Sequence, residues 1–217
     1  ELLNKIYHPH GIQSILCGMI APEASGWFRR TFTTPEDLAG LKMNASGLGG
    51  KVLNKLGVET HTLQDADILI ALESGEIDGV EFSMPAIDIK LGFYQLADYY
   101  YFPGWHQPSS FFELIINKDR WDALTKTRQA QIEAVCGDNV RYGLAEGEAL
   151  QYDALKELTA KGVKIKRWPA AILSALEDAW KDVAIEQSSA NTNFREVWRS
   201  LSDFRKDYAI WRELARP

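Results

Sequence analysis

The sequence lacks most of the motifs from which a function can be read directly. Its 217 residues contain no apolar run long enough to span a membrane, no HExxH or GxSxG motif, and no stretch enriched in basic residues. The formal net charge of −6, together with the missing basic stretch, argues against a nucleic-acid partner. No nucleophile and base stand together in a recognisable pattern, so we do not expect an enzyme.

Cysteine is scarce as well. Cys17 and Cys136 are the only two, and they lack the CxxC spacing of a zinc site or of a thioredoxin-like motif. Both lie in apolar stretches, where free cysteines commonly pack as small apolar residues. We therefore interpret them as buried free thiols, with a disulfide between them as the alternative.

Apolar and aromatic residues are plentiful, and their order indicates an α/β fold. Between Leu41 and Phe82, short apolar stretches alternate with amphipathic segments, which predicts strands and helices joined by short connections. This rhythm is typical of a largely parallel sheet with crossover helices. Ligands of open α/β sheets bind outside the carboxyl ends of the strands, so we expect Asn44 and Glu81 at such ends.

A proline-free segment from Thr125 to about Lys161 repeats apolar residues every three or four positions. The pattern predicts a helix of about 50 Å, which exceeds a small domain and would cross two lobes. Gly137, Gly143 and Gly147 are the positions at which this helix could break.

Two segments, Asp78–Pro85 and Tyr99–Gln107, combine large aromatic rings with a carboxylate, an imidazole and an amide. Aromatic walls with a few polar groups are typical of small-molecule pockets, although aromatic residues also pack in cores. Glu81 lies in an apolar neighbourhood, where a buried acid needs a cation, hydrogen-bond donors or a ligand. We expect Trp105 to line the ligand cleft.

Several stretches in fixed order resemble a known family. The residues that carry the resemblance are Ile20–Arg29, Asp37–Met43, Gly47–Gly57, Asp67–Gly79 and Lys90–Tyr94. They are similar to the DctP-like solute-binding subunits of TRAP transporters (tripartite ATP-independent periplasmic transporters). The stretch Glu81–Gln107 resembles the branch that binds 2-oxo and 2-hydroxy acids with a metal ion. The resemblance implies a two-lobed α/β periplasmic binding protein fold, type II-like, with a long helix spanning both lobes.

The resemblance also implies a division of the chain. Family members are longer at the N-terminus, and Glu1–Tyr7 reads as the end of an amphipathic helix, so we expect upstream residues to be missing. We assign residues 1–12 and 81–119 to the remainder of the first lobe and the hinge strands. Residues 13–80 and 120–217 are assigned to the second lobe, with the long helix and the C-terminal helices.

Carried over position by position, the resemblance implies a metal site made of oxygen ligands, which suits Na⁺ or Ca²⁺. Glu23 stands where the metal-binding branch often has a Gln ligand. Glu81 and Phe82 stand where that branch has Glu-Trp. Gln107 falls near the position of a Glu ligand, so that acid and amide are exchanged at two places. No organic cofactor is implied.

We expect the ligand to be bound by Asn44, Asp67, Phe82, Met84 and Trp105. Asn44 is the main departure, because the family motif is Leu-Lys-Met-Arg and that Arg forks onto the substrate carboxylate. An Asn is uncharged and shorter, so either another cation compensates or the ligand differs. Arg29 and Lys42 are the nearest cations in the sequence. If the lobe still binds a carboxylate, Asn44→Arg should tighten binding.

The resemblance thus implies a periplasmic protein that captures a small organic acid, a 2-oxo or 2-hydroxy monocarboxylate, for the membrane subunits of a TRAP transporter. The alternative is a ligand-sensing or regulatory binding domain with altered specificity, which Asn44 and the missing N-terminal part favour. A homodimer is a further possible assembly.

Overall fold

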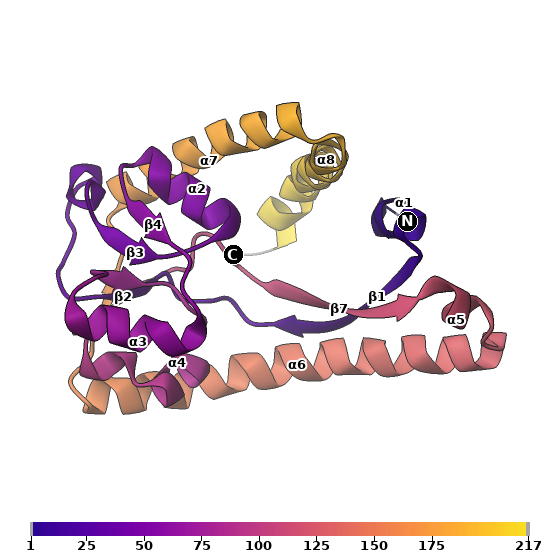
Figure 1. Ribbon diagram of the computed structural model, residues 1–217, viewed down its shortest axis with the longest axis horizontal. Coiled ribbons are helices and arrows are strands. Elements are labelled where there is room, and N and C mark those ends of the chain that lie inside the picture. The colour runs from indigo at the N-terminus through magenta and orange to yellow at the C-terminus, as the bar shows by residue number, and fades with distance from the viewer. Residues whose placement is uncertain (1, 216–217) are drawn as a thin grey trace.

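The protein is described by a computed structural model that covers residues 2–215 (Figure 1). The strands are β1 (Ile12–Ile20), β2 (Gly26–Phe28), β3 (Lys42–Asn44), β4 (Glu59–His61), β5 (Gly79–Val80), β6 (Tyr99–Phe102), β7 (Ser110–Asn117) and β8 (Lys164–Arg167). The helices are α1 (Leu2–Tyr7), α2 (Gly47–Lys55), α3 (Asp65–Ser74), α4 (Pro85–Leu91), α5 (Lys118–Asp122), α6 (Lys126–Ala160), α7 (Ala170–Ala190) and α8 (Thr192–Ala215). Short 3₁₀ helices are η1 (His8–His10), η2 (Pro35–Leu38) and η3 (Phe93–Gln95). Within residues 2–215, no helix is both long enough and apolar enough to cross a bilayer.

A six-stranded sheet forms the larger part of the fold, with the strand order β4-β3-β5-β2-β6-β8. Strand β3 runs parallel to β4 and β5, and β6 runs parallel to β8, whereas β2 is antiparallel to both of its neighbours. The rhythm predicted between Leu41 and Phe82 is confirmed as β3, α2, β4, α3 and β5. Asn44 ends β3 and Glu81 follows β5, so both lie at the carboxyl ends of their strands, as expected.

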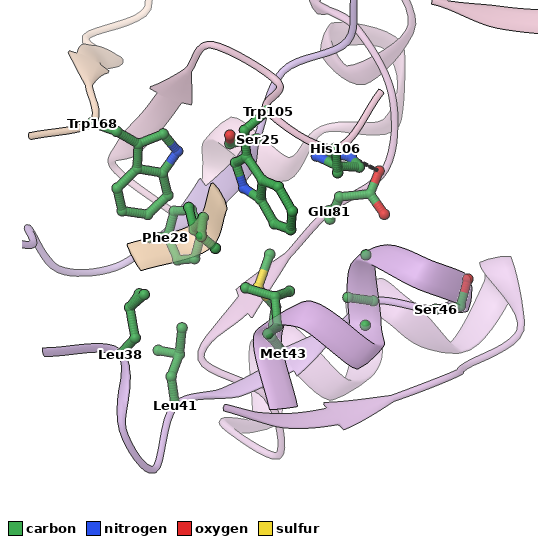
Figure 2. Close-up of a pocket in the computed structure, with 15 residues that line it drawn as sticks. Ser25, Phe28, Leu38, Leu41, Met43, Ser46, Glu81, Trp105, His106 and Trp168 are labelled. Atoms are coloured by element: carbon green, nitrogen blue, oxygen red, sulfur yellow. Dashed lines mark ion pairs between the residues drawn. The ribbon is translucent and has the colours of Figure 1, made fainter. Parts of the chain in front are cut away.

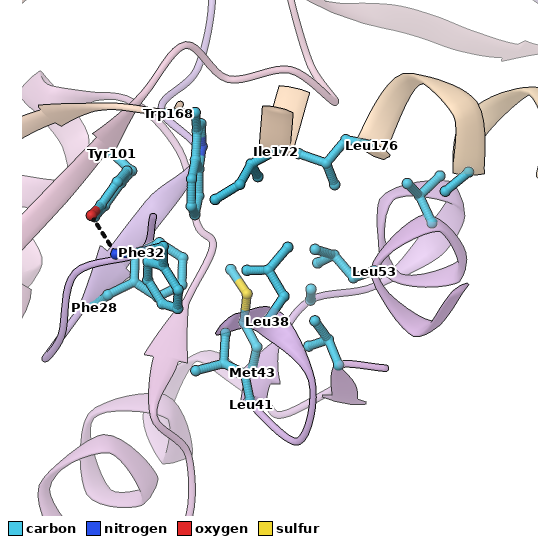
Figure 3. Packing of buried hydrophobic residues seen from close by; sticks show 14 of the residues in the cluster. Phe28, Phe32, Leu38, Leu41, Met43, Leu53, Tyr101, Trp168, Ile172 and Leu176 are labelled. Carbon is cyan, nitrogen blue, oxygen red and sulfur yellow. Dashed lines mark hydrogen bonds between the residues drawn. The ribbon is translucent and has the colours of Figure 1, made fainter. Parts of the chain in front are cut away.

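Neighbouring residues of the central strands point to opposite faces of this sheet, and each face has its own core. Phe28 and Tyr101 belong to the cluster that helices α2 and α7 cover (Figure 3). Trp27 and Tyr100 belong to the opposite cluster, to which α3 and α6 contribute. Burial of apolar side chains on both faces holds the strands in place, so the loops at the sheet edge start from a fixed frame.

Helix α6 spans Lys126–Ala160 without interruption, which confirms the prediction of one long helix. Thr125 precedes it, and its hydroxyl accepts a hydrogen bond from the backbone N–H of Arg128 at 3.3 Å, as an N-cap residue does. The helix runs under both sheets (Figure 1): it lies along β1 of the two-stranded β1–β7 sheet, and its far end packs on α4. Leu158, near that end, is fully buried in the core of the larger sheet.

None of the three glycines of α6 breaks the helix, and two of them, Gly143 and Gly147, allow the β1 segment to approach it. A Cβ atom at Gly143 would lie 2.8 Å from the carbonyl oxygen of Met19. A Cβ atom at Gly147 would lie 3.3 Å from the backbone nitrogen of Ala21. A side chain at either position would force the strand away from the helix, because atoms this close already touch.

The two cysteines are joined to each other, so the interpretation as free thiols was wrong. A disulfide bond connects Cys17 of β1 to Cys136 of α6. The sequence could not indicate this pairing, because 119 positions separate the two residues and only the fold brings β1 onto α6. The disulfide adds a covalent link to the contacts that Gly143 and Gly147 permit.

The lobe boundaries stay a prediction, and the sheet pairing favours a revised division. Strand β6, within residues 81–119, pairs with β2 and β8 in the six-stranded sheet. Strand β1, within residues 13–80, pairs with β7 in the two-stranded sheet. We propose that residues 2–20 and 110–125 belong with the two-stranded sheet, and that residues 26–102 belong with the six-stranded sheet.

Candidate functional site

Polar side chains gather at one edge of the six-stranded sheet. Asn44 and His61 are the last residues of β3 and β4, and Glu81 directly follows β5. Because β2 is antiparallel to β5, the segment that enters β2 lies at this same edge, and it carries Glu23. The segment that leaves β6 reaches the edge as well and carries His106. Five loops therefore meet where ligands of open α/β sheets bind.

The Glu23 and His106 loops are held against each other by their backbones. The N–H of Glu23 donates to the carbonyl oxygen of Gln107 at 3.1 Å, and the N–H of Ala24 donates to that of Ser83 at 2.9 Å. Gly104 makes this approach possible, because a Cβ atom there would lie 2.0 Å from the carbonyl oxygen of Glu23. The loops thus meet through backbone atoms, which fixes the side chains they carry.

Glu23, Glu81 and His106 form a cluster in which one ligand atom from each residue lies within 4.8 Å of the others. His106 Nε2 lies 3.2 Å from Glu81 Oε1, and the two side chains face each other at the rim of a crevice (Figure 2). Glu23 is buried, with 6% of its surface exposed, and the side chain of His106 retains 8%. Such an arrangement can hold a cation, because two carboxylates and an imidazole converge with little water around them.

Glu23 is the buried residue of the three, and burial disfavours its charged carboxylate. Burial raises the pKa of its carboxyl group, and the nearby Glu81 raises that pKa further, while His106 and the hydroxyl of Ser110 act in the opposite direction. Its Oε1 accepts hydrogen bonds from Gln107 Nε2 at 3.2 Å and from Ser110 Oγ at 3.3 Å. Its Oε2 is buried without a hydrogen-bond partner among the described residues. A bound cation would satisfy that oxygen.

Gln107 is one of the metal ligands that the sequence predicted, and the structure gives it a supporting position. Its Nε2 donates to Glu23 Oε1 and, at 2.9 Å, to Ser110 Oγ. In this orientation the amide fixes the Glu23 carboxylate. Whether Gln107 also binds a metal stays a prediction.

The side chain of Asn44 is hydrogen-bonded to backbone groups of the fold. Its Oδ1 accepts a hydrogen bond from the backbone N–H of Leu63 at 3.1 Å, and its Nδ2 lies 3.4 Å from the carbonyl oxygen of Glu81. The amide therefore links the loops that follow β4 and β5. Its role in ligand binding stays a prediction.

The two cations that could have replaced the expected arginine lie elsewhere. Arg29 follows the antiparallel strand β2 and so leaves the sheet at the opposite edge, where it donates to the carbonyl oxygens of Leu72 and Leu96. Lys42 begins β3 and is exposed at that same opposite edge. Neither is placed to receive a ligand beside Glu81.

Trp105 lies between two hollows. The inner crevice, which Glu81, His106 and Met43 also line, has a volume of about 20 Å³, which is room for about one water molecule. The outer groove of about 500 Å³ lies between α2, α7 and α8 and shares Trp105 and His106 with the crevice. Trp105 thus borders open space at the carboxyl edge of the parallel strands, and its part in ligand binding stays a prediction.

The remaining predicted ligand residues are more peripheral. Phe82 is partly buried and packs against Phe93, with 5.6 Å between the ring centroids. Met84 is buried, and its sulfur accepts a hydrogen bond from Gln151 Nε2 at 3.1 Å. Asp67 is exposed in the first turn of α3 and lines neither hollow, so we do not carry it into the proposed site.

Sequence reasoning missed a further buried acid near Glu23 and Glu81. Asp88 of α4 is fully buried, and its Oδ2 accepts hydrogen bonds from Trp27 Nε1 at 2.9 Å and from the Tyr100 hydroxyl at 2.7 Å. Burial raises the pKa of Asp88 to about 7, although both hydrogen bonds oppose the shift. No motif marks this group, because its two donors come from separate strands, β2 and β6, which the fold brings beside α4.

Comparison with known proteins finds relatives over nearly the whole chain. Residues 22–190 match the model of the family described as bacterial extracellular solute-binding protein, family 7. The monocarboxylate 2-oxoacid-binding periplasmic protein of Nostoc sp. (strain PCC 7120) is 32% identical over 209 residues, which are 96% of this chain and 57% of that protein. The matched family is one of binding proteins and not of enzymes, as the sequence led us to expect.

Solved structures agree with this match. A TRAP transporter solute-binding protein from Bordetella bronchiseptica RB50, a dimer with copurified calcium and picolinate, is 36% identical with a TM-score of 0.92 over 99% of this chain and 64% of its own. One from Pseudoalteromonas atlantica T6c, with bound sodium and pyruvate, is 28% identical with a TM-score of 0.89 over 99% of this chain and 65% of its own. The chain therefore spans 57% to 65% of the length of these relatives. The expected fold class and the resemblance seen in the sequence are both confirmed.

Proposed function

Because this chain belongs to family 7 of the bacterial extracellular solute-binding proteins, we propose that it is part of a periplasmic receptor for a small organic acid. The acid is a 2-oxo or 2-hydroxy monocarboxylate, and a metal ion binds with it. The observation that carries the proposal is the cluster of Glu23, Glu81 and His106 at the carboxyl edge of the parallel strands. The relatives were solved with calcium or sodium beside pyruvate or picolinate, which supports the same pairing of cation and acid here.

The 2-oxo acid and the metal ion have complementary chemistry. A 2-oxo acid offers a carboxylate and a neighbouring carbonyl oxygen, which together can chelate one cation. The buried Glu23 and the partly buried Glu81 bring two carboxylates together at the edge of the sheet, and a cation between them would offset their repulsion. The ring of Trp105 lies nearly edge to face with that of His106, 5.2 Å away, and offers an apolar wall for the rest of a small acid.

A thermal-shift screen of the 217-residue chain tests this proposal. Pyruvate, lactate, picolinate and acetate are each added with and without a divalent cation. A ligand at one hundred times its dissociation constant should stabilise the fold by about 2.7 kcal/mol. We expect a shift for the chelating acids in the presence of a cation and none for acetate. Equal shifts for acetate would contradict chelation.

Delivery to the membrane subunits of a TRAP transporter is the corresponding cellular role. The alternative is a ligand-sensing or regulatory domain, which gains support from Asn44 because its amide serves the fold at the position of the expected arginine. Co-purification with the membrane subunits of a TRAP transporter would favour transport. A chain that binds the acid but not those subunits would favour sensing.

We also propose that the protein forms a homodimer, as the Bordetella relative does. Helix α8 contributes no buried residue, and it exposes Phe204, Ile210, Trp211 and Leu214. Light scattering after size-exclusion chromatography measures the mass, and Trp211→Ser should shift it towards the monomer.

A further inference from the structure

We infer that Gln151 of α6 is a positioning residue for the cation site, because one turn of the long helix sets the distance between Glu23 and Glu81. The inference rests on the proposed function and deepens it, since it names the part of the fold that holds the two carboxylates together. Gln151 lies outside the cluster of Glu23, Glu81 and His106, and it acts through the loops that carry them.

Helix α4, which follows the Glu81 loop, begins with residues that cannot cap it. Met84 stands at the N-cap position and makes no side-chain hydrogen bond to the helix. Pro85 comes next and has no N–H to donate. The N–H of Ala86 donates instead to Gln151 Oε1 at 3.0 Å. A residue of α6 therefore does for α4 what an N-cap side chain does in other helices.

The Gln151 amide is fixed at both of its ends. Its Nε2 donates to the carbonyl oxygen of Gly147 at 2.7 Å and to the sulfur of Met84 at 3.1 Å. Because Oε1 faces an N–H group and Nε2 faces two acceptors, the amide cannot turn round without losing these contacts. Gln151 thus holds Met84 and Ala86 on α6, a few residues after Glu81.

The segment that leads to Glu23 rests on the same turn of α6. A Cβ atom at Gly147 would lie 3.3 Å from the backbone nitrogen of Ala21, which shortly precedes Glu23. Positions 147 and 151 lie on one face of the helix, because residues four apart stand above one another. Helix α4 packs against α6 (Figure 1). Both carboxylates are therefore placed relative to a single helical turn.

The two loops also touch each other, at a hydrogen bond from the Ala24 N–H to the Ser83 carbonyl oxygen at 2.9 Å. This bond alone would let the loops swing about it, and the contacts with Gly147 and Gln151 remove that freedom. Cation affinity depends on the spacing of the oxygen ligands, and partners outside the ligands themselves commonly change it 10- to 100-fold. A shift of the Glu81 loop on α6 should therefore weaken the cation site.

Calorimetric titration of the metal-free 217-residue chain with Ca²⁺ alone tests the inference. Gln151→Met keeps the length of the side chain and removes both ends of the amide, so we expect Ca²⁺ binding to weaken about tenfold. Gln131→Met is the matched control, because Gln131 is exposed on the same helix. It should leave the affinity within about twofold. An unchanged Ca²⁺ affinity in Gln151→Met, or an equal loss in Gln131→Met, would overturn the inference.

A residue that only ties α4 to α6 would lower the melting temperature without changing the Ca²⁺ affinity, so both are measured. Gly147→Ala is a second variant, in which the added methyl group presses on Ala21 while alanine favours the helix. We expect weaker Ca²⁺ binding with little change in melting temperature. Unchanged Ca²⁺ affinity in this variant would refute the shared turn. In the metal-free chain, hydrogen exchange of the Ala86 N–H should be faster in Gln151→Met, and an equal rate would refute the cap.

Pyruvate titrations of the Ca²⁺-loaded chain separate this inference from the proposed function. Pyruvate binding together with a Ca²⁺ affinity that does not depend on Gln151 counts against the inference alone. Ca²⁺ binding that depends on Gln151, without pyruvate binding, upholds the inference and counts against the proposed acid. A chain that binds no Ca²⁺ contradicts both.

Discussion

Gly143 of α6 lies directly against Met19 of β1, with room for a hydrogen atom but not for a side chain. A Cβ atom at position 143 would stand 2.8 Å from the Met19 carbonyl oxygen. Backbone oxygens cannot move aside as the end of a flexible side chain can. The distance between α6 and β1 is therefore set by the absence of a side chain at position 143.

We expect Gly143→Ala to lower the free energy of unfolding by about 1–3 kcal/mol, the usual cost of inserting a methyl group into a packed contact. Gly137→Ala is the matched control, since nothing lies within 4 Å of a Cβ atom there. In the same helix it should be neutral or stabilising by up to about 1 kcal/mol. Urea unfolding of both variants measures the difference. Equal effects at the two positions would show that β1 does not rest on α6 as described.

The disulfide gives a second expectation about this contact. Cys17 and Cys136 close a loop of 119 residues, which reduces the freedom of the unfolded chain. The Cys17→Ser/Cys136→Ser variant should lose about 2–5 kcal/mol of stability. Dithiothreitol should lower the melting temperature of the unmodified chain and leave that of the double variant unchanged. A melting temperature insensitive to the reductant in both would contradict a stabilising bond.

Asp88 should make stability depend on pH between about 4 and 7. Its pKa rises from the ordinary 3.8 to about 7 through burial, so in this range the folded protein keeps a proton that the unfolded chain releases. The stabilisation is complete below pH 4 and is lost as the pH rises towards 7, by about 4 kcal/mol for three pKa units. Chemical unfolding of Asp88→Asn across this range should show a flatter profile than the unmodified chain. A profile of equal slope would exclude Asp88 as the source.

Asn44 is expected to matter for stability first. Asn44→Ala removes the acceptor for the Leu63 N–H and the donor near the Glu81 carbonyl oxygen, at a cost of about 1–2 kcal/mol. Asn44→Arg loses the same two contacts, so its stability should fall similarly even if the added charge tightens acid binding. Unfolding and calorimetric titration of both variants separate the two effects. Full stability of Asn44→Ala would mean that the amide does not link the two loops.

Gln107→Glu would place a second acid within hydrogen-bonding distance of the Glu23 carboxylate. We expect the metal-free variant to be less stable at neutral pH, since two carboxylates now share a buried site, and to bind divalent cations more tightly. Adding Glu23→Gln restores the original charge and should return both properties towards those of the unmodified chain. Direct titration with Zn²⁺ and thermal melts measure them. Independent effects of the two substitutions would argue against the coupling of residues 23 and 107.

The local pattern of apolar residues predicted many of the helices and strands, because each element forms through interactions between residues close together in the sequence. The alternation that produced β3, α2, β4, α3 and β5, and the repeat that produced α6, both arise from burying one face of an element. Glu81 was placed at the correct edge by the same logic. The pairing of Cys17 with Cys136 was out of reach, because it depends on how β1 packs on α6.

The same limit applies to the site. The stretch around His106 stood out by composition, yet its closeness to Glu23 and Glu81 comes from the antiparallel strand β2, which brings the start of one segment beside the ends of two others. Asp88 needed the side chains of Trp27 and Tyr100 from neighbouring strands. The spacing of residues in the sequence does not indicate which side chains from different strands come into contact.

The register of β1 has a consequence for the segment that leads to the Glu23 loop. The pairing with β7 shifts between Leu16 and Gly18, so Cys17 is an extra residue in the strand, and the disulfide fastens it to α6. Side chains alternate along a strand, and one residue more or fewer turns every later one to the other side. Deleting the bulged residue would rotate the segment that leads to Glu23. The register of residues 18–20, from which the chain enters the Glu23 loop, is therefore set by a bulge that the disulfide fastens to α6, outside the site.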